Sequence, residues 1–280
     1  MFLGASHLEF RDDVHDLTRD FENELQQASR MHHYIVRVAG RDFGAVYDRL
    51  LDENSGWQDS YNGGDAVWDA EIELGMHPWT LSKHLGFMTL VRTVALAEIV
   101  LARLGAACWQ EPEYTVYPLG KTWSRRWERE FYTTCLKRKF DPGAGGFGAL
   151  RALRDLYAHG YGVPVDPSDL QALARRLYGA FSSAPPTREE VDLGFGGTMS
   201  FFGEHAKFSR QDGLVEGFFF KLPEAELTPL AVHRSIETIR STIAEAGAAV
   251  VGGTVDDVSA TRFVRTVSRF WEQHGGVPTD

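Results

Sequence analysis

The chain has 280 residues, 43% of them hydrophobic, so it can bury a core in one large domain or two modest ones. Its formal net charge of −10 argues against tight, indiscriminate binding to nucleic acid over the whole surface. The two cysteines, Cys108 and Cys135, lie in apolar helical patterns without metal-site spacing, which favours a reducing, cytoplasmic setting.

Two stretches bear on secretion and membrane insertion. Residues 1–7 contain no basic segment and no long apolar core, so we expect no secretory signal. The most apolar run, residues 85–105, is interrupted by Arg92, Glu98 and Arg103. This pattern predicts a buried helix of a soluble protein rather than a membrane span, and hence a cytoplasmic protein with no membrane partner.

The first region, residues 1–77, is predicted to form helices that end in a loop. Apolar residues recur at helical spacing over residues 17–38 and 43–51. A polar stretch, residues 54–65, follows these helices. Its Asn62-Gly63-Gly64 sequence is typical of a turn or loop.

The second region, residues 78–182, has the strongest helical patterns. We predict helices over residues 78–104, 123–140, 149–159 and 168–181. Every fourth position of the second helix is apolar or small, in a stripe formed by Trp123, Trp127, Phe131 and Cys135. The glycine-rich stretch 143–148 is typical of a flexible connector, because it lacks the Gly-Lys-Ser/Thr of a phosphate loop. Ser168 is the predicted N-cap of the last helix.

The third region, residues 183–280, combines strands and helices. Residues 199–208 and 214–221 are aromatic-rich runs separated by an Asp-Gly turn sequence, which predicts a β-hairpin. Helices are expected over residues 230–246 and 258–274. The expected fold class is therefore mainly α, with an additional C-terminal α+β region that contains the hairpin.

One segment of this acidic chain is basic. Residues 121–154 contain nine Lys or Arg and three acidic residues, so the segment carries +6 while the rest of the chain carries −16. A solvated helix face is the ordinary explanation of such a charge run. The alternative is a phosphate-binding surface, because the segment leads directly into the helix over residues 149–159.

The most informative sequence of the chain is Arg154-Asp155-Leu156-Tyr157-Ala158-His159, at the end of an amphipathic helix that stops at Gly160. Arginine is a fixed cation that matches phosphate geometry, and histidine titrates near neutral pH. At about 100° per residue, Arg154 and His159 lie about 140° apart, at opposite margins of the polar face. One helix therefore does not direct both side chains to one spot, whereas two copies of the helix, or a bend at Gly160, would.

The residue pattern alone leaves two interpretations of this segment open. Arg151, Asp155 and His159 are spaced four residues apart, so they could form a ladder of surface ion pairs, each worth about a few tenths of a kcal/mol. The charged form of His159 would also be stabilised at a helix C-terminus. The alternative is a site that binds and cleaves RNA at its phosphates.

The segment from Arg154 to His159 resembles the signature of HEPN domains. In that signature an Arg is followed by a polar residue and, after a few intervening positions, by a His at the end of a late helix of an α-helical bundle. The order of the predicted helices around the segment is similar as well. The resemblance implies a HEPN-like antiparallel helical bundle over residues 78–182, between an N-terminal helical region (1–77) and the C-terminal region (183–280).

The resemblance further implies a metal-independent endoribonuclease without a cofactor. His159 would act as general base on a ribose 2′-hydroxyl or as acid on the leaving oxygen, Arg154 would stabilise charge on the scissile phosphate, and Asp155 would orient the pair. Because a 2′-hydroxyl is required, the substrate would be RNA. HEPN nucleases typically dimerise to build a composite site, and many are toxins or antiviral defence effectors. A homodimer and a protein inhibitor (an antitoxin) are therefore the protein partners that the resemblance implies.

Further RNA contacts are expected from the basic segment and from the signature helix. The candidate RNA-binding residues are Arg125, Arg126, Arg129, Arg151 and Tyr157. Trp123 and Trp127 could stack on single-stranded RNA beside the arginines, but a tryptophan pair four residues apart is more often part of a core.

Other polar residues are less specific. His32 and His33 are adjacent, and His77 and His84 are seven residues apart; neither pair has the close partners of a metal site, so we expect no metal. Glu98 lies in an apolar helix and must be paired if it is buried. We expect a salt bridge to an arginine of the core; support of the Arg–His site is the alternative.

A second class of function stays open, namely a catalytically silent HEPN-like helical module that binds nucleotide, RNA or a protein partner. Arg154 and His159 would then serve only packing or surface roles. The intact signature favours the ribonuclease, and the acidic net charge favours the silent module.

Overall fold

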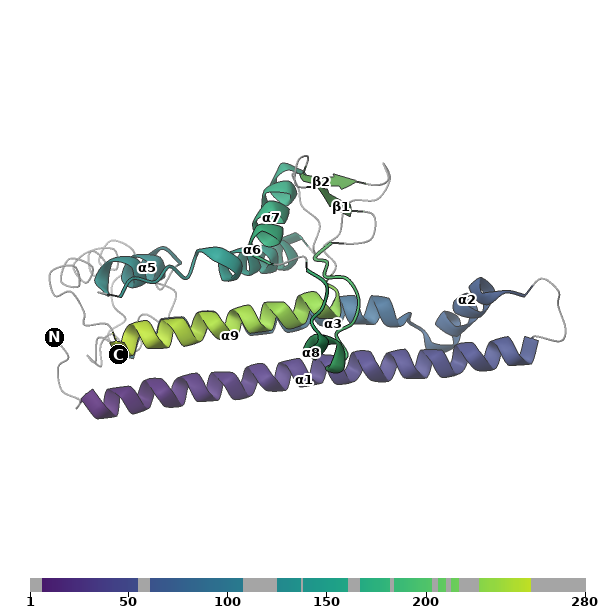
Figure 1. The fold of residues 1–280 in the computed structure, drawn as a ribbon, viewed down its shortest axis with the longest axis horizontal. Coiled ribbons are helices and arrows are strands. Elements are labelled where there is room, and N and C mark those ends of the chain that lie inside the picture. Colours follow the sequence, from purple (N-terminus) through teal and green to yellow (C-terminus); the bar gives the residue numbers. More distant parts are fainter. Residues whose placement is uncertain are drawn as a thin grey trace, which may run out of the picture. The chain divides into compact units, whose positions relative to one another are not determined.

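The computed structural model describes residues 7–54, 61–107, 125–136, 138–160, 167–181, 184–202, 206–209, 213–216 and 227–252. The described part is mostly helical, which confirms the expected mainly α class. The chain divides into two compact units. Unit 1 comprises residues 1–25, 92–152 and 235–280, and unit 2 comprises residues 26–91 and 153–234. Four helices, α1, α3, α6 and α9, contribute residues to both units (Figure 1).

The first helix is longer than the sequence pattern suggests. The two stretches expected to be helical, residues 17–38 and 43–51, belong to one continuous helix, α1 (His7–Asn54). Gly40 lies between them, and a Cβ built on it would meet nothing within 4 Å. A single helical glycine costs about 1 kcal/mol relative to alanine, which the flanking turns outweigh.

The expected loop at Asn62-Gly63-Gly64 is the start of a second helix, α2 (Gly63–Leu74). The side-chain oxygen of Asn62 accepts hydrogen bonds from the Gly64 N–H (2.7 Å) and the Asp65 N–H (3.4 Å), and the Asp65 carboxylate accepts one from the Asn62 N–H (3.0 Å). This reciprocal capping box satisfies backbone donors that would otherwise lack partners. The helix ends at Gly75, whose φ of 74° is left-handed. The turn prediction was wrong here because Asn-Gly signals serve both turns and helix starts.

The long apolar helix was predicted correctly and is α3 (Pro78–Ala107). Its stretch Thr80–Gly105 contains an 18-residue window with a mean hydropathy of 1.8 and would be long and apolar enough to cross a membrane, although half of that window is buried inside the structure. In unit 1 its core residues include Val94, Ala97, Leu101 and Leu104.

The helix expected over residues 123–140 is shorter and changes type. It consists of α5 (Arg125–Glu130) and a π-helical turn, η1 (Phe131–Cys135), after which Leu136 is extended. The wider turn buries both Phe131 and Tyr132. Of these two residues, only Phe131 belonged to the predicted apolar stripe. The Tyr132 hydroxyl donates a hydrogen bond to the carbonyl of Leu101 (2.7 Å), so α3 fixes the turn in unit 1.

The next two helices begin earlier than expected. The signature helix, α6, spans Gly145–Gly160, and α7 spans Pro167–Ala180. Ser168 therefore lies inside the first turn of α7, so its prediction as the N-cap was wrong. Proline suits the first helical position because it lacks the N–H that would have no partner there.

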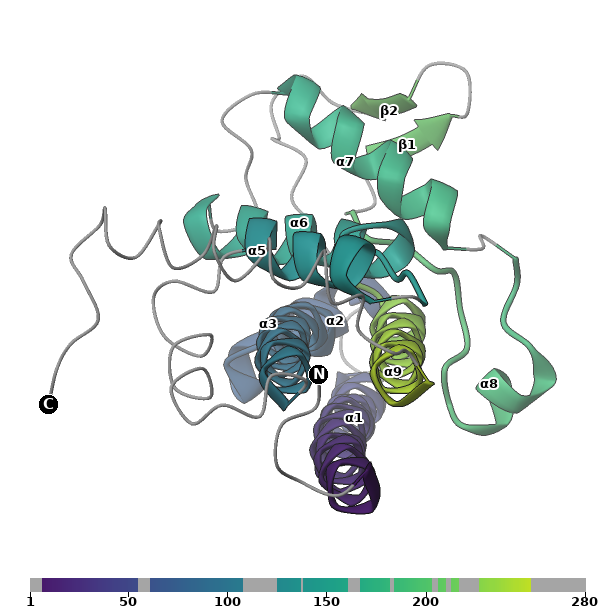
Figure 2. The same ribbon diagram turned by 90° about the vertical axis from the view of Figure 1, so that its left-hand side faces the viewer.

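Unit 2 also contains a short helix and two short strands. The helix is α8 (Arg188–Asp192), and β1 (Ala206–Ser209) pairs antiparallel with β2 (Gly213–Glu216), with Ala206 opposite Glu216. Both strands lie beside α7 (Figure 2). The last described helix is α9 (Pro229–Gly252); the helix expected over residues 258–274 lies outside the described residues.

Each unit has its own core and its own ion pairs. In unit 1, Phe21, Leu25 and Ile239 are buried, and Arg240 pairs with Glu22 at 2.8 Å. The unit 2 core includes Phe87, Leu153, Leu177, Phe195, Phe201 and Leu230. At its edge Arg234 donates to Glu190 and holds the pKa of that carboxyl down to about 2.

His32 is a polar residue inside the apolar packing of unit 2. Its side chain is 3% exposed, and its Nε2 atom has no hydrogen-bond partner within the described part of the chain. Burial and the neighbouring His33 lower the pKa of His32 to about 4, although a hydrogen bond with the backbone of Ser82 opposes the shift. The folded state therefore holds His32 neutral.

We expect the stability of the protein to fall on acidification through His32. The folded pKa lies below the ordinary value of 6.5, so the stabilisation is present above pH 6.5 and is lost as the pH falls towards 4. The shift corresponds to about 3 kcal/mol. Urea unfolding at several pH values should show this loss in the wild type and a smaller loss in His32→Leu. The exposed His15, changed to Gln, is the control; equal pH dependence in wild type and His32→Leu would contradict the expectation.

Candidate functional site

The signature residues lie in the part of α6 that belongs to unit 2. Leu153 is fully buried, while the next two side chains are partly exposed, 21% for Arg154 and 34% for Asp155. Arg154 Nε lies 3.3 Å from Asp155 Oδ1. The structure thus places an Asp155 carboxylate oxygen close to the Arg154 guanidinium.

His159 lies in the last turn of the same helix, next to Gly160. Its side chain lies outside the described residues. The separation of His159 from Arg154 follows from helix geometry, which places them about 140° apart around the axis. A site that uses both residues therefore needs a further element, such as the same helix of a second copy.

Tyr157 packs against unit 2. Its ring is stacked on that of Phe87 from α3, with centroids 4.4 Å apart and an interplanar angle of 4°. Phe87 itself is 1% exposed. One face of Tyr157 is therefore occupied by the protein, and only the other face or the hydroxyl is left for a nucleotide.

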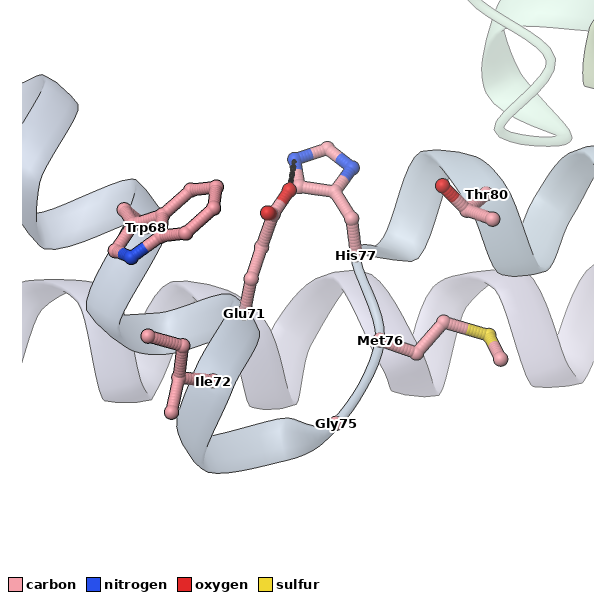
Figure 3. A pocket seen from close by; sticks show the side chains of 7 residues that line it. All are labelled: Trp68, Glu71, Ile72, Gly75, Met76, His77 and Thr80. Atoms are coloured by element: carbon pink, nitrogen blue, oxygen red, sulfur yellow. Dashed lines mark ion pairs between the residues drawn. The ribbon is translucent and has the colours of Figure 1, made fainter.

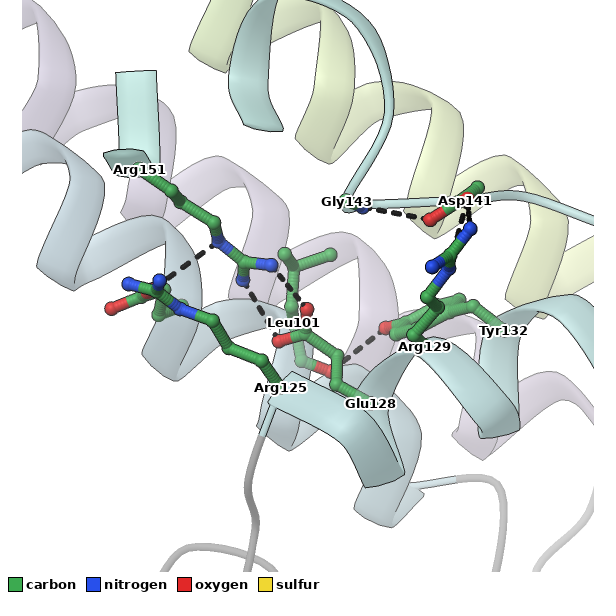
Figure 4. Close-up of polar contacts among 9 residues, drawn as sticks. Leu101, Arg125, Glu128, Arg129, Tyr132, Asp141, Gly143 and Arg151 are labelled. Atoms are coloured by element: carbon green, nitrogen blue, oxygen red, sulfur yellow. Dashed lines mark hydrogen bonds and ion pairs between the residues drawn. The ribbon is translucent and has the colours of Figure 1, made fainter. Parts of the chain in front are cut away.

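Arg151 has a different environment from the one expected of an RNA-binding residue. Its side chain is 4% exposed, and its two Nη atoms donate to the two carboxylate oxygens of Glu128 at 2.7 and 3.0 Å (Figure 4). Arg151 Nε lies 3.2 Å from Glu98, and the guanidinium lies 4.5 Å from the ring centroid of Phe147. The expectation that Arg151 contacts RNA is corrected on this ground, because the guanidinium is enclosed and its charge is satisfied within unit 1.

The same contacts decide the role of Glu98 and exclude Arg151 from the surface ladder considered for the signature helix. Glu98 pairs with Arg125 (3.0 Å) and Arg151 (3.2 Å), which confirms the expected salt bridge to a core arginine. Because Arg151 pairs with Glu128 and Glu98, it is not the first step of a surface ladder with Asp155. Asp155 pairs instead with the adjacent Arg154.

The partner of Arg151, Glu128, was not singled out in the sequence. Burial raises the pKa of the Glu128 carboxyl, and the hydrogen bonds from Arg151 oppose that shift. The burial of Glu128 could have been suspected from its position, three residues before Phe131 and therefore at the margin of the apolar stripe. A carboxylate at such a margin must find a cation when the helix packs.

The other candidate arginines lie on α5 and belong to unit 1. Arg125 is 45% exposed and pairs with Glu98, and Arg129 is 67% exposed and pairs with Asp141 at 2.9 Å. The side chains of Arg126 and of the two stripe tryptophans, Trp123 and Trp127, lie outside the described residues. Two exposed cations of this helix are thus already bound to carboxylates, which a phosphate would have to displace.

The buried pair predicts a large difference between two arginine substitutions. Arg151→Ala leaves the Glu128 carboxylate buried without its bidentate partner, so the free energy of unfolding should fall by about 3–5 kcal/mol. Arg129→Ala removes an exposed pair and should cost at most about 1 kcal/mol. Urea unfolding of both variants measures the difference. A double variant, Arg151→Met with Glu128→Leu, should recover most of the loss because it leaves no buried charge or amide without a partner. Equal losses in the two single variants would contradict the buried pair.

Among the described residues, no group of three or more His, Cys, Asp or Glu side chains is placed to hold a metal ion. His77 lies 3.8 Å from Glu71, and Cys135 is a buried free thiol. No protein-family model, no curated protein and no solved structure matches this chain.

Proposed function

We propose that this protein is a metal-independent endoribonuclease of HEPN type. The observation that carries the proposal is the Arg154–Asp155 pair, partly exposed on the last turns of an amphipathic helix, five residues before His159. A cation held in place by a carboxylate is suited to an anionic phosphate, and a histidine is suited to proton transfer near neutral pH.

The proposed reaction is attack of a ribose 2′-hydroxyl on the adjacent phosphate. His159 takes the proton of the 2′-hydroxyl, and the new O2′–P bond forms as the P–O5′ bond breaks. Arg154 stabilises the negative charge that develops on the phosphate oxygens, and Asp155 holds the guanidinium in position. The leaving 5′-oxygen takes a proton from water. The reaction needs no cofactor.

A homodimer is part of the proposal. Because helix geometry separates Arg154 from His159 around one axis, a complete site is assembled from the α6 helices of two copies. We propose further RNA contacts from Arg125, Arg126, Arg129 and Tyr157. A toxin or antiviral role in the cytoplasm, with a protein inhibitor (an antitoxin) as partner, also belongs to this proposal, on family analogy alone.

We also propose two more specific assignments of the fold. The first is a HEPN-like bundle over residues 78–182. The second is a C-terminal hairpin region, which the pairing of β1 with β2 supports.

A catalytically silent helical module is the second candidate. The stacking of Tyr157 on the buried Phe87 supports it, because packing alone accounts for one signature residue. In this case Arg154 and His159 would be dispensable for any RNA chemistry.

The ribonuclease proposal predicts cleavage of RNA in the presence of EDTA. Purified protein incubated with structured RNA should give products ending in a 2′,3′-cyclic phosphate, and DNA of the same sequence should stay intact. Arg154→Ala and His159→Ala should each lower the rate at least about 100-fold, the range of a lost general base or oxyanion stabiliser.

Two matched variants control this experiment. Arg176 on α7 and His84 on α3 are exposed residues of unit 2, so Arg176→Ala and His84→Ala should cleave at the wild-type rate. Cleavage that survives Arg154→Ala or His159→Ala would contradict the site, and loss of cleavage in EDTA would contradict the metal-independent mechanism.

The composite site predicts a dimer in solution and complementation between two inactive chains. Light scattering at micromolar concentration should give twice the monomer mass of 31.4 kDa. Mixing Arg154→Ala with His159→Ala should restore part of the activity, since one of the two sites in a mixed dimer then has both residues. A monomer that cleaves RNA would contradict the composite site.

A further inference from the structure

A pocket opens in unit 2 at the turn between α2 and α3, far along the chain from the signature helix. Its volume is about 370 Å³, and its wall includes Trp68, Glu71, Ile72, Met76, His77 and Thr80 (Figure 3). We call the four residues Trp68, Glu71, Ile72 and Met76 the α2 patch. Neither the ribonuclease nor the silent module uses this patch.

The apolar members of the α2 patch are exposed. The exposed fractions are 65% for Trp68, 66% for Ile72 and 46% for Met76. Trp68 and Ile72 are four residues apart, so they lie on one face of α2. Large apolar side chains that gather on an exposed surface mark interaction sites, because water contact with them is unfavourable.

The chain segment that carries the patch is acidic in sequence. Residues 49–83 contain two cations, Arg49 and Lys83, and seven acidic residues: Asp52, Glu53, Asp59, Asp65, Asp69, Glu71 and Glu73. Several of these carboxylates already make other interactions within the protein. Asp65 caps α2, Asp69 accepts from Tyr61, and Glu73 pairs with Arg49. Glu71 is 34% exposed and stands between Trp68 and His77 in the pocket wall (Figure 3).

The local structure holds the pocket open before anything binds. The capping box at Asn62 fixes the start of α2, and the pair of Arg49 with Glu73 ties its end to α1. The ring of Phe43 on α1 meets that of His77 at 5.0 Å between centroids. A preformed site loses little conformational entropy on binding.

We propose that the α2 patch binds a short cationic segment of a protein partner, with one apolar side chain in the pocket and a Lys or Arg of the segment against Glu71. Trp68, Ile72 and Met76 supply the apolar contact, and the indole face together with the Glu71 carboxylate attracts a cation. The surrounding negative charge accelerates encounter with a basic segment. A second copy of this chain is disfavoured as the occupant, because two-fold pairing would bring two such acidic surfaces together.

A labelled peptide tests the chemistry of the occupant. The probe is a fluorescein-labelled hexapeptide, Lys-Lys-Leu-Phe-Lys-Lys, followed by fluorescence anisotropy with the full chain. Two control peptides separate the contribution of charge from that of apolar contact. Lys-Lys-Ser-Ser-Lys-Lys keeps the positive charge, and Glu-Glu-Leu-Phe-Glu-Glu keeps the apolar pair. Both should bind at least about tenfold more weakly than the probe, since apolar burial and charge complementarity are each needed.

Matched variants locate the binding on the α2 patch. Trp68→Ala should raise the Kd for the probe at least about tenfold, and Glu71→Gln about threefold. The exposed Ile99 on α3 and Glu189 on α8 serve as controls, so Ile99→Ser and Glu189→Gln should leave the Kd unchanged. Because Trp68 is mostly exposed, Trp68→Ala should keep the wild-type melting temperature, which circular dichroism checks.

The indole N–H signal of Trp68, assigned by its loss in Trp68→Ala, should shift in the NMR spectrum when the probe is added. No binding at millimolar probe, equal binding by either control peptide, or an unchanged Kd in Trp68→Ala would overturn the proposal. Self-association that Trp68→Ala abolishes would also overturn it, because the occupant would then be a second copy. Apart from that self-association, which would also move the proposed dimer contact away from α6, none of these outcomes affects the ribonuclease proposal.

Discussion

The bidentate pair of Arg151 with Glu128 is the interaction on which the packing of unit 1 depends. It joins α6 to α5, and Glu98 extends it to α3. Both charges of the pair are almost fully buried, so any slip between these helices would leave a charge without compensation. An apolar contact tolerates small slips, whereas this pair is satisfied in one relative position only. Phe147 and Tyr132 then pack around helices whose register is already set.

The same pair shows where prediction from the sequence succeeds and where it stops. The periodicity of apolar residues located α1, α3, α6, α7 and α9, because one buried face leaves a direct trace in the sequence. Arg151 was placed on the polar half of α6, since a helical wheel sorts residues by type. Burial of a charge depends on a partner 23 residues away, and no local pattern records that partner. The start of α2 was missed for a different reason, because residues that cap a helix also form turns.

The ion pairs also change how the basic segment is understood. The sequence assigns +6 to residues 121–154, but three of its arginines, Arg125, Arg129 and Arg151, are bound to carboxylates. Two of the carboxylates, Glu128 and Asp141, are already counted in the +6, and Glu98 is the one that comes from outside the segment. The pairs therefore matter because they engage these three guanidinium groups, which a phosphate would have to draw away from their carboxylates. Arg154 also has a carboxylate beside it, but this carboxylate belongs to the next residue in the chain, Asp155. The proposed site thus rests on a local pair in α6, which the sequence did reveal, rather than on the wider positive charge.

The π-helical turn η1 has a consequence for how this chain is compared with others. A π turn holds one residue more than an α turn, so neighbouring residues lie closer together around the helix axis. Phe131 and Tyr132 can therefore both face the core before the chain becomes extended at Leu136. A homologue with an ordinary α turn here would have one residue fewer, and its alignment would open a one-residue gap between Phe131 and Cys135. Such a gap would mark a change of helix type rather than a change of length.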